Sequence, residues 1–191
     1  MQKTEHPRYR LSVAQFAELP EEEGFRLELV RGSVVGEPAP GLRHSRVALA
    51  FLDILREFGE RAGLGLVFFD TGFVVNPTEP TVRVPDVAFV SSERLPQGAL
   101  TDELGEGAPD VVVEVVSPSN SASALQRKAL DYLDGGARLV WVADPEAGTV
   151  TVYHSRSRIQ ILEGADLLTA EGVIPGLEAR VDQLLGRRPE P

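Results

Sequence analysis

Apolar residues recur along this chain with the spacing of helices in some stretches and with that of strands in others. Residues 44–61 carry apolar side chains three and four positions apart, which predicts the longest helix. A second helix is predicted over 121–134, where an apolar stripe ends at a pair of glycines. Shorter helices are predicted over 12–19, where Ser12 can cap the first turn, and over 176–186.

Short runs rich in β-branched and aromatic residues predict strands between these helices. The run VVVEVVS at 111–117 is almost continuously apolar, as in a central strand that is covered on both faces. The other predicted strands are two around a turn at Arg31–Gly32 and runs over 65–70, 71–76, 82–90, 139–144, 149–155 and 158–164. This order of helices and strands predicts an α/β fold with a mixed β-sheet flanked by helices.

Composition narrows the class of protein. The chain has 191 residues, which fits a single domain over 1–191, with polar or proline-rich ends at 1–10 and 187–191 that we expect to be loose. It has no cysteine, which excludes disulfides and zinc–thiolate sites. No apolar run is long enough for a membrane span, and the segment MQKTEHPRYR lacks an apolar signal core. We therefore expect a cytoplasmic protein. The net charge of −10 argues against a general nucleic-acid coat protein, though not against an enzyme that meets nucleic acid locally.

Three charged residues do not fit their apolar surroundings. Glu114 interrupts the run of valines at 111–116, and Asp86 interrupts VRVPDVAFV. Lys128 lies on the apolar stripe of its predicted helix, in a chain whose only other lysine is Lys3. Each has an ordinary alternative: Glu114 a structural ion pair, Asp86 a turn after Pro85, and Lys128 a stem that covers apolar surface. Together, the two carboxylates could bind a hard divalent cation such as Mg²⁺, with the lysine close by.

These segments occur in the order found in a known family. RLELVRG, RVPDVAFV, PDVVVEVVSPSN, K-x-x-x-Y, LVWVADP and IPGLEARVDQLL together resemble the Uma2 family, also called DUF820, from about Leu11 to Leu185. Its members are described as endonucleases of the PD-(D/E)xK restriction-endonuclease-like superfamily. The resemblance implies an αβββαβ core, a Mg²⁺ or Mn²⁺ cofactor and hydrolysis of phosphodiester bonds.

The resemblance also implies roles for particular residues. Asp86 and Glu114 match the acidic motif positions, and Lys128 matches a lysine that this family places on the following helix. The usual lysine two positions after the glutamate is replaced by Val116. Glu28 matches an acidic position that often helps to hold the metal, although an exposed strand glutamate is an equal alternative.

Two further positions bear on the site. His44 matches a histidine at the start of the long helix, where it could line the cleft or only pack against the helix end. The family often has an acidic residue four positions before the lysine, where this chain has Ala124. Tyr132 is expected to be a core residue rather than a site residue. Ser117 and Asn120 are expected to satisfy backbone groups at the turn from strand to helix.

The misfit residues and the resemblance to the Uma2 family together predict a metal-dependent endonuclease. Asp86, Glu114 and Lys128 are the expected catalytic residues, and the resemblance implies Glu28 and His44 as accessory ones. Asp86, Glu114 and Glu28 are the predicted metal ligands. The expected partner is nucleic acid, DNA before RNA, with a homodimer or a higher homo-oligomer as an open possibility. The alternatives are a catalytically degenerate binding or regulatory module on the same fold and an enzyme for small phosphodiesters.

Overall fold

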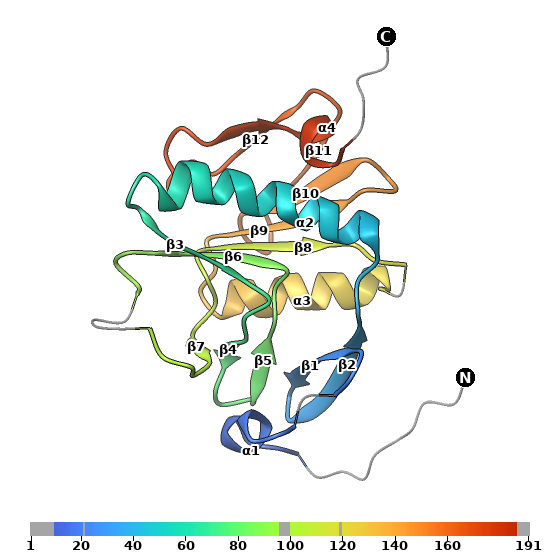
Figure 1. Cartoon of the computed structure of the whole chain (residues 1–191), viewed down its shortest axis with the longest axis vertical. Helices are drawn as coiled ribbons and strands as arrows, with labels where there is room; N and C mark the ends of the chain where they lie inside the picture. The colour runs from blue at the N-terminus through green and yellow to red at the C-terminus, as the bar shows by residue number, and fades with distance from the viewer. Residues whose placement is uncertain (1–9, 21, 96–99, 119, 187–191) are drawn as a thin grey trace.

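A six-stranded mixed sheet forms the centre of the molecule (Figure 1). The computed structural model describes residues 10–20, 22–95, 100–118 and 120–186, so the predicted loose ends lie outside it except for Arg10. The strand order is β11-β10-β9-β8-β6-β3, in which β8 and β9 run parallel and the other neighbours antiparallel. The strands are β3 (Gly65–Phe69), β6 (Val87–Ser91), β8 (Val111–Val115), β9 (Leu139–Asp144), β10 (Thr149–Tyr153) and β11 (Ile159–Glu163).

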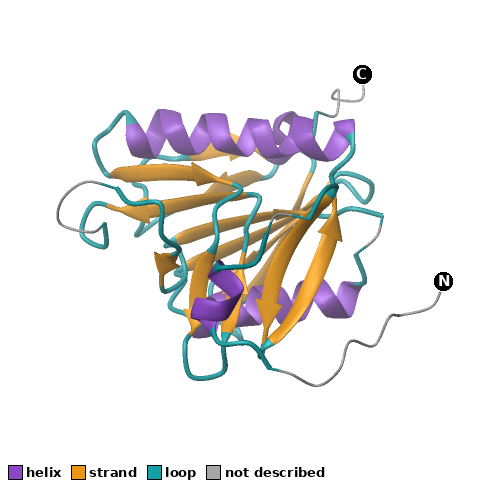
Figure 2. Ribbon diagram, turned by 60° about the horizontal axis from the view of Figure 1, so that its bottom comes forward, coloured by secondary structure: helices purple, strands orange, loops and turns teal. Residues whose placement is uncertain are grey.

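Two long helices cover the opposite faces of this sheet, as Figure 2 shows with the strands between them. Helix α2 (Leu42–Leu55) packs on β6 and β8 and continues into a π-helical turn, η1 (Arg56–Glu60). Helix α3 (Ala122–Asp134) packs on β9 from the other side. The succession α2, β3, β6, β8, α3, β9 is the predicted αβββαβ core, so the predicted fold class is confirmed.

A second, five-stranded sheet lies below α3 in the view of Figure 1. Its order is β2-β1-β5-β4-β7, and β4 also contacts α3, so this helix lies against both sheets. The short helix α1 (Val13–Ala17) adds Phe16 to a small core with Leu29 and Val82. The strands are β1 (Phe25–Val30), β2 (Ser33–Pro38), β4 (Phe73–Asn76), β5 (Thr81–Arg83) and β7 (Gly105–Glu106).

The predicted strand over 82–90 is in fact two strands in different sheets. β5 ends at Arg83 and belongs to the five-stranded sheet, whereas β6 begins at Val87 and belongs to the six-stranded sheet. Pro85 has no N–H group to donate to a ladder, which is consistent with the break. Asp86 therefore lies where the chain crosses from one sheet to the other, and not within a strand.

The C-terminal segment also differs from its prediction. The predicted helix over 176–186 is wrong in its first half, because β13 (Glu178–Arg180) pairs with β12 (Leu167–Thr169) as a two-stranded ladder. Only α4 (Val181–Leu184) is helical, and Val181 and Leu184 join the same core as the buried residues of α2. None of the described helices has the length and apolar character that crossing a membrane requires.

Candidate active site

A cleft of about 990 Å³ opens between the two sheets and the start of α2. Asp86 and Glu114 both line it, together with His44 at the start of α2 and with Ser117 and Asn120 after β8. Asn120 accepts a hydrogen bond from the backbone N–H of Ser117 at 2.9 Å and donates its own N–H to the Ser117 carbonyl at 3.0 Å. These two residues close the turn from strand to helix as predicted.

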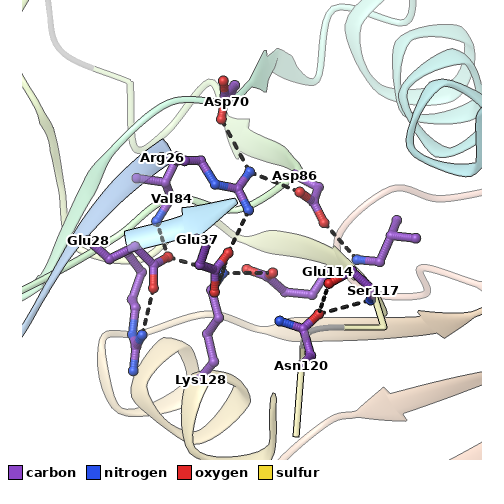
Figure 3. Close-up of polar contacts among 12 residues, drawn as sticks. Arg26, Glu28, Glu37, Asp70, Val84, Asp86, Glu114, Ser117, Asn120 and Lys128 are labelled. Carbon is purple, nitrogen blue, oxygen red and sulfur yellow. Dashed lines mark hydrogen bonds and ion pairs between the residues drawn. The ribbon is translucent and has the colours of Figure 1, made fainter. Parts of the chain in front are cut away.

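The Asp86 carboxylate is buried and bonded on both oxygens (Figure 3). Its Oδ2 accepts the backbone N–H of Val115 at 2.7 Å and lies 3.1 Å from Nε2 of His44. Its Oδ1 accepts Nη1 of Arg26 at 2.9 Å. Burial alone would raise the pKa of Asp86, but the His44 hydrogen bond and the Arg26 charge lower it to about 2. Asp86 is therefore a carboxylate at neutral pH.

Glu114 is held from the other side by α3. Its Oε1 accepts the hydroxyl of Tyr132 at 2.6 Å, and its Oε2 lies 2.9 Å from Nζ of Lys128. Burial raises the pKa of Glu114 to about 7, although the Lys128 charge acts to lower it. Tyr132 is fully buried, as expected of a core residue, and its hydroxyl also reaches the candidate site.

Lys128 is almost fully buried, at 3% exposure, and is surrounded by carboxylates. Its Nζ lies 3.0 Å from Oε1 of Glu28, 2.9 Å from Glu114 and 3.4 Å from Oε2 of Glu37. Burial would lower the pKa of this ammonium, but the charges of Glu114, Glu28 and Glu37 raise it above its usual value. Lys128 is therefore a permanent cation, and these three acids orient it although position 124 is an alanine.

Glu28 lies with Lys128 rather than on the cleft surface. Its Oε2 accepts Nη1 of Arg83 at 2.7 Å, and its Oε1 accepts the backbone N–H of Val84 at 2.8 Å. Lys128 and Arg83 lower the pKa of the buried Glu28 carboxyl against the effect of burial. Neither Glu28 nor Lys128 is among the described residues that line the cleft. The part of Glu28 in metal binding stays a prediction.

Two residues of the site, Arg26 and Glu37, were not singled out from the sequence. Both line the cleft, and Nη2 of Arg26 lies 2.9 Å from Oε2 of Glu37. A signal for them existed in the predicted hairpin. A tight turn at Arg31–Gly32 sets the register that places Arg26 opposite Glu37, and strand alternation puts Arg26 on the same face as Glu28.

The candidate site has oxygen ligands of the kind that a divalent cation prefers, but these ligands are not arranged around one point. Asp86 and Glu114 supply the carboxylate oxygens that Mg²⁺ and Mn²⁺ prefer. However, no group of three or more histidine, aspartate or glutamate side chains in the described part of the chain is arranged to hold a metal ion. The guanidinium of Arg26 lies against Asp86, one of the two carboxylates that would hold such a cation.

Comparison with solved structures supports the fold. The chain resembles the crystal structure of a putative nuclease belonging to DUF820 from Anabaena variabilis, with a TM-score of 0.81 and 21% sequence identity. The match covers 92% of this chain and 98% of that one. No curated protein matches the chain.

Comparison with family models gives the relationship. The model of the Uma2 family, described as "Putative restriction endonuclease", matches residues 13–182. That span contains both sheets, α2, α3 and every candidate site residue. The chain therefore belongs to the Uma2 family.

Proposed function

We propose that this protein is a metal-dependent endonuclease that hydrolyses phosphodiester bonds of nucleic acid. The observation that carries the proposal is that Asp86 and Glu114 line one cleft of an αβββαβ core, with Lys128 buried directly behind Glu114. The fold and the family support a nuclease. The two carboxylates supply donors for a cation, and the lysine supplies a buried positive charge.

In this proposal Asp86 and Glu114, with Glu28 as a predicted third acid, would hold Mg²⁺ or Mn²⁺, which would supply a Lewis acid for the phosphate and for the attacking water. The chain's own residues set up the rest. Lys128 compensates Glu114 and places a fixed positive charge behind the carboxylates, which stabilises negative charge that develops on the phosphate. His44 holds the second oxygen of Asp86 from the start of α2.

DNA is the first substrate to test, because the family is described as restriction endonucleases, and RNA is the second. A cytoplasmic location belongs to the same proposal and fits the absence of cysteine. A homodimer is also part of it. β11 is an edge strand of the six-stranded sheet, and its Ile159 and Ile161 are exposed, which leaves an edge where a second copy could pair.

The test is cleavage of single- and double-stranded DNA and RNA in Mn²⁺ and in Mg²⁺. We expect wild-type cleavage to fall at least about a hundredfold in Asp86→Asn and in Lys128→Ala. Asp53→Asn on the exposed side of α2 and Arg127→Ala, next to Lys128 but exposed, are the matched controls and should retain activity. If all variants behave alike, the assignment of the site is wrong.

A second candidate function is a non-catalytic binding or regulatory module. The observation that favours it is that Arg26 and Lys128 already neutralise the site carboxylates. Such a module would fold well and bind neither Mn²⁺ nor Mg²⁺, so titration calorimetry separates it from the nuclease. Activity on bis(p-nitrophenyl) phosphate without affinity for nucleic acid would instead indicate an enzyme for small phosphodiesters.

A further inference from the structure

The guanidinium of Arg26 is held by three carboxylates at the mouth of the candidate site (Figure 3). Nη1 lies 2.9 Å from Asp86 and 3.2 Å from Asp70, and Nη2 lies 2.9 Å from Glu37. Burial would lower the pKa of Arg26, but the charges of Asp86 and Glu114 hold it well above its usual value. Arg26 is therefore a fixed positive charge within the field of both predicted catalytic carboxylates.

This position conflicts with a second cation on Asp86. Oδ2 of Asp86 already accepts the backbone N–H of Val115 and faces His44. Oδ1 is the oxygen that the guanidinium takes. A divalent ion on Oδ1 would meet the positive charge of Arg26 at close range, where repulsion between like charges is only partly screened. One of the two cations has to withdraw.

Arg26 can withdraw without losing every ionic partner. Glu37 and Asp70 hold the guanidinium independently of Asp86, and Asp70 is more than half exposed at the cleft rim. In addition, Nε of Arg26 is buried without a hydrogen-bond partner among the described residues, so the present pose does not satisfy all of its donors. A modest shift toward Glu37 and Asp70 would free Oδ1 of Asp86 while both ion pairs persist.

We propose that Arg26 is a built-in counter-ion that competes with the divalent cation for Asp86 and so sets the cation concentration at which the site fills. This inference rests on the proposed function, because it concerns the cation that the nuclease would use. In the metal-free protein Arg26 stabilises the carboxylates. In the loaded protein it is displaced toward Glu37 and Asp70.

The test is the affinity for Mn²⁺, measured by titration calorimetry without substrate. Arg26→Gln keeps a polar side chain and removes the competing charge, so we expect it to bind Mn²⁺ at least about tenfold more tightly than wild type. In EDTA the same variant should unfold at a lower temperature than wild type, and Mn²⁺ should recover that loss. Arg61→Gln, which removes an equally positive but 73% exposed side chain just after η1, should leave the affinity unchanged.

The outcomes separate this inference from the proposed function. Equal or weaker Mn²⁺ binding by Arg26→Gln, with a wild type that binds Mn²⁺ and cleaves, would overturn the competition and leave the nuclease standing. Absence of Mn²⁺ binding in both proteins would overturn both. If Arg26→Gln does not fold, Arg26→Met takes its place. A methionine keeps an apolar stem and removes the competing charge, so tighter binding is again expected, and unchanged affinity would overturn the competition.

Discussion

At the scale of single residues, Glu114 is a side chain whose charge near neutral pH is set by its surroundings. It is buried, it receives one hydrogen bond from Tyr132, and it shares Lys128 with Glu28. Because burial raises its pKa from 4.5 to about 7, the folded protein binds a proton that the unfolded chain releases between these pH values. Glu114 therefore makes the fold less stable as pH rises through this window.

Glu114→Gln should remove this dependence. We expect the free energy of unfolding of wild type to fall, relative to that of the variant, by roughly 1–3 kcal/mol between pH 4.5 and pH 7.5. Urea unfolding of both proteins across this range measures the difference. Glu79→Gln, at an exposed ion pair in the turn before β5, is the control and should follow wild type. A constant difference between wild type and Glu114→Gln would contradict the raised pKa.

Lys128 supports the folded state as well as the proposed chemistry. Lys128→Met keeps the apolar stem but leaves Glu28 and Glu114 buried without their shared cation, which we expect to destabilise the protein by about 3–5 kcal/mol. The matched variant Arg127→Met changes an exposed neighbour and should shift stability by less than about 0.5 kcal/mol. Chemical denaturation at neutral pH compares the two. Similar losses would show that Lys128 is not the structural cation inferred from its contacts.

At the scale of elements, the hairpin β1–β2 and helix α3 supply four of the charged side chains in the cleft and directly behind it. The hairpin supplies Arg26, Glu28 and Glu37, and α3 supplies Lys128 opposite them. The sequence predicted both elements, because their local spacing and turn residues are strong signals. It did not predict that they meet, since the contact depends on how two sheets dock, which no local pattern encodes. For this reason Asp86, Glu114 and Lys128 could be found as misfits, whereas Arg26 and Glu37 were missed.

The position one turn before Lys128 on α3 gives a prediction at this scale. An acid at 124 would form an i, i+4 pair with Lys128, which is worth only about 0.5 kcal/mol even on an open helix. Lys128 is already oriented by three carboxylates, so Ala124→Glu should change the cleavage rate by no more than about twofold. Cleavage rates of the wild type and of Ala124→Glu, measured on one DNA substrate, test this prediction. A gain of tenfold or more would mean that the alanine limits the site.

At the scale of the whole molecule, the charge distribution limits how nucleic acid can bind. The chain carries a net charge of −10, and Arg26 and His44 are the two basic side chains among the described residues that line the cleft. Both face Asp86, so little free positive charge points at a phosphate backbone. The affinity that comes from releasing counterions should therefore be small.

This distribution predicts a shallow dependence of DNA binding on salt. For Asp86→Asn without divalent cations, we expect the logarithm of the affinity to fall against the logarithm of salt with a slope no steeper than about −2, as two phosphate contacts would give. Fluorescence anisotropy of a labelled duplex between 50 and 200 mM salt, values at which such slopes are resolved, measures it. A slope near about −5 would point to a basic surface outside the cleft, for which Arg43 and Arg46 on α2 are the first residues to change.

Like the candidate site, the overall fold was predicted from the sequence in part. The mixed sheet flanked by helices followed from periodicity, and the resemblance to the Uma2 family implied the αβββαβ order. The inner place of β8 in the sheet followed from its nearly continuous valines. The division of residues 82–90 between two sheets was not predicted. A proline inside a strand-like run is compatible either with an edge strand or with a chain that passes from one sheet to another. The strand at 178–180 was missed because its partner β12 lies a loop away in sequence and only tertiary pairing selects it.

The position of the site between two sheets bears on when during folding it can exist. Asp86 and Glu114 belong to the six-stranded sheet and its entry, whereas Arg26, Glu28 and Glu37 belong to the five-stranded one. A chain that has formed only one sheet, during synthesis or in a transient opening, holds part of the constellation and leaves Lys128 without Glu28 and Glu37. The nuclease activity that we propose would then be confined to the completed molecule. A half-made chain would be harmless to the nucleic acid around it.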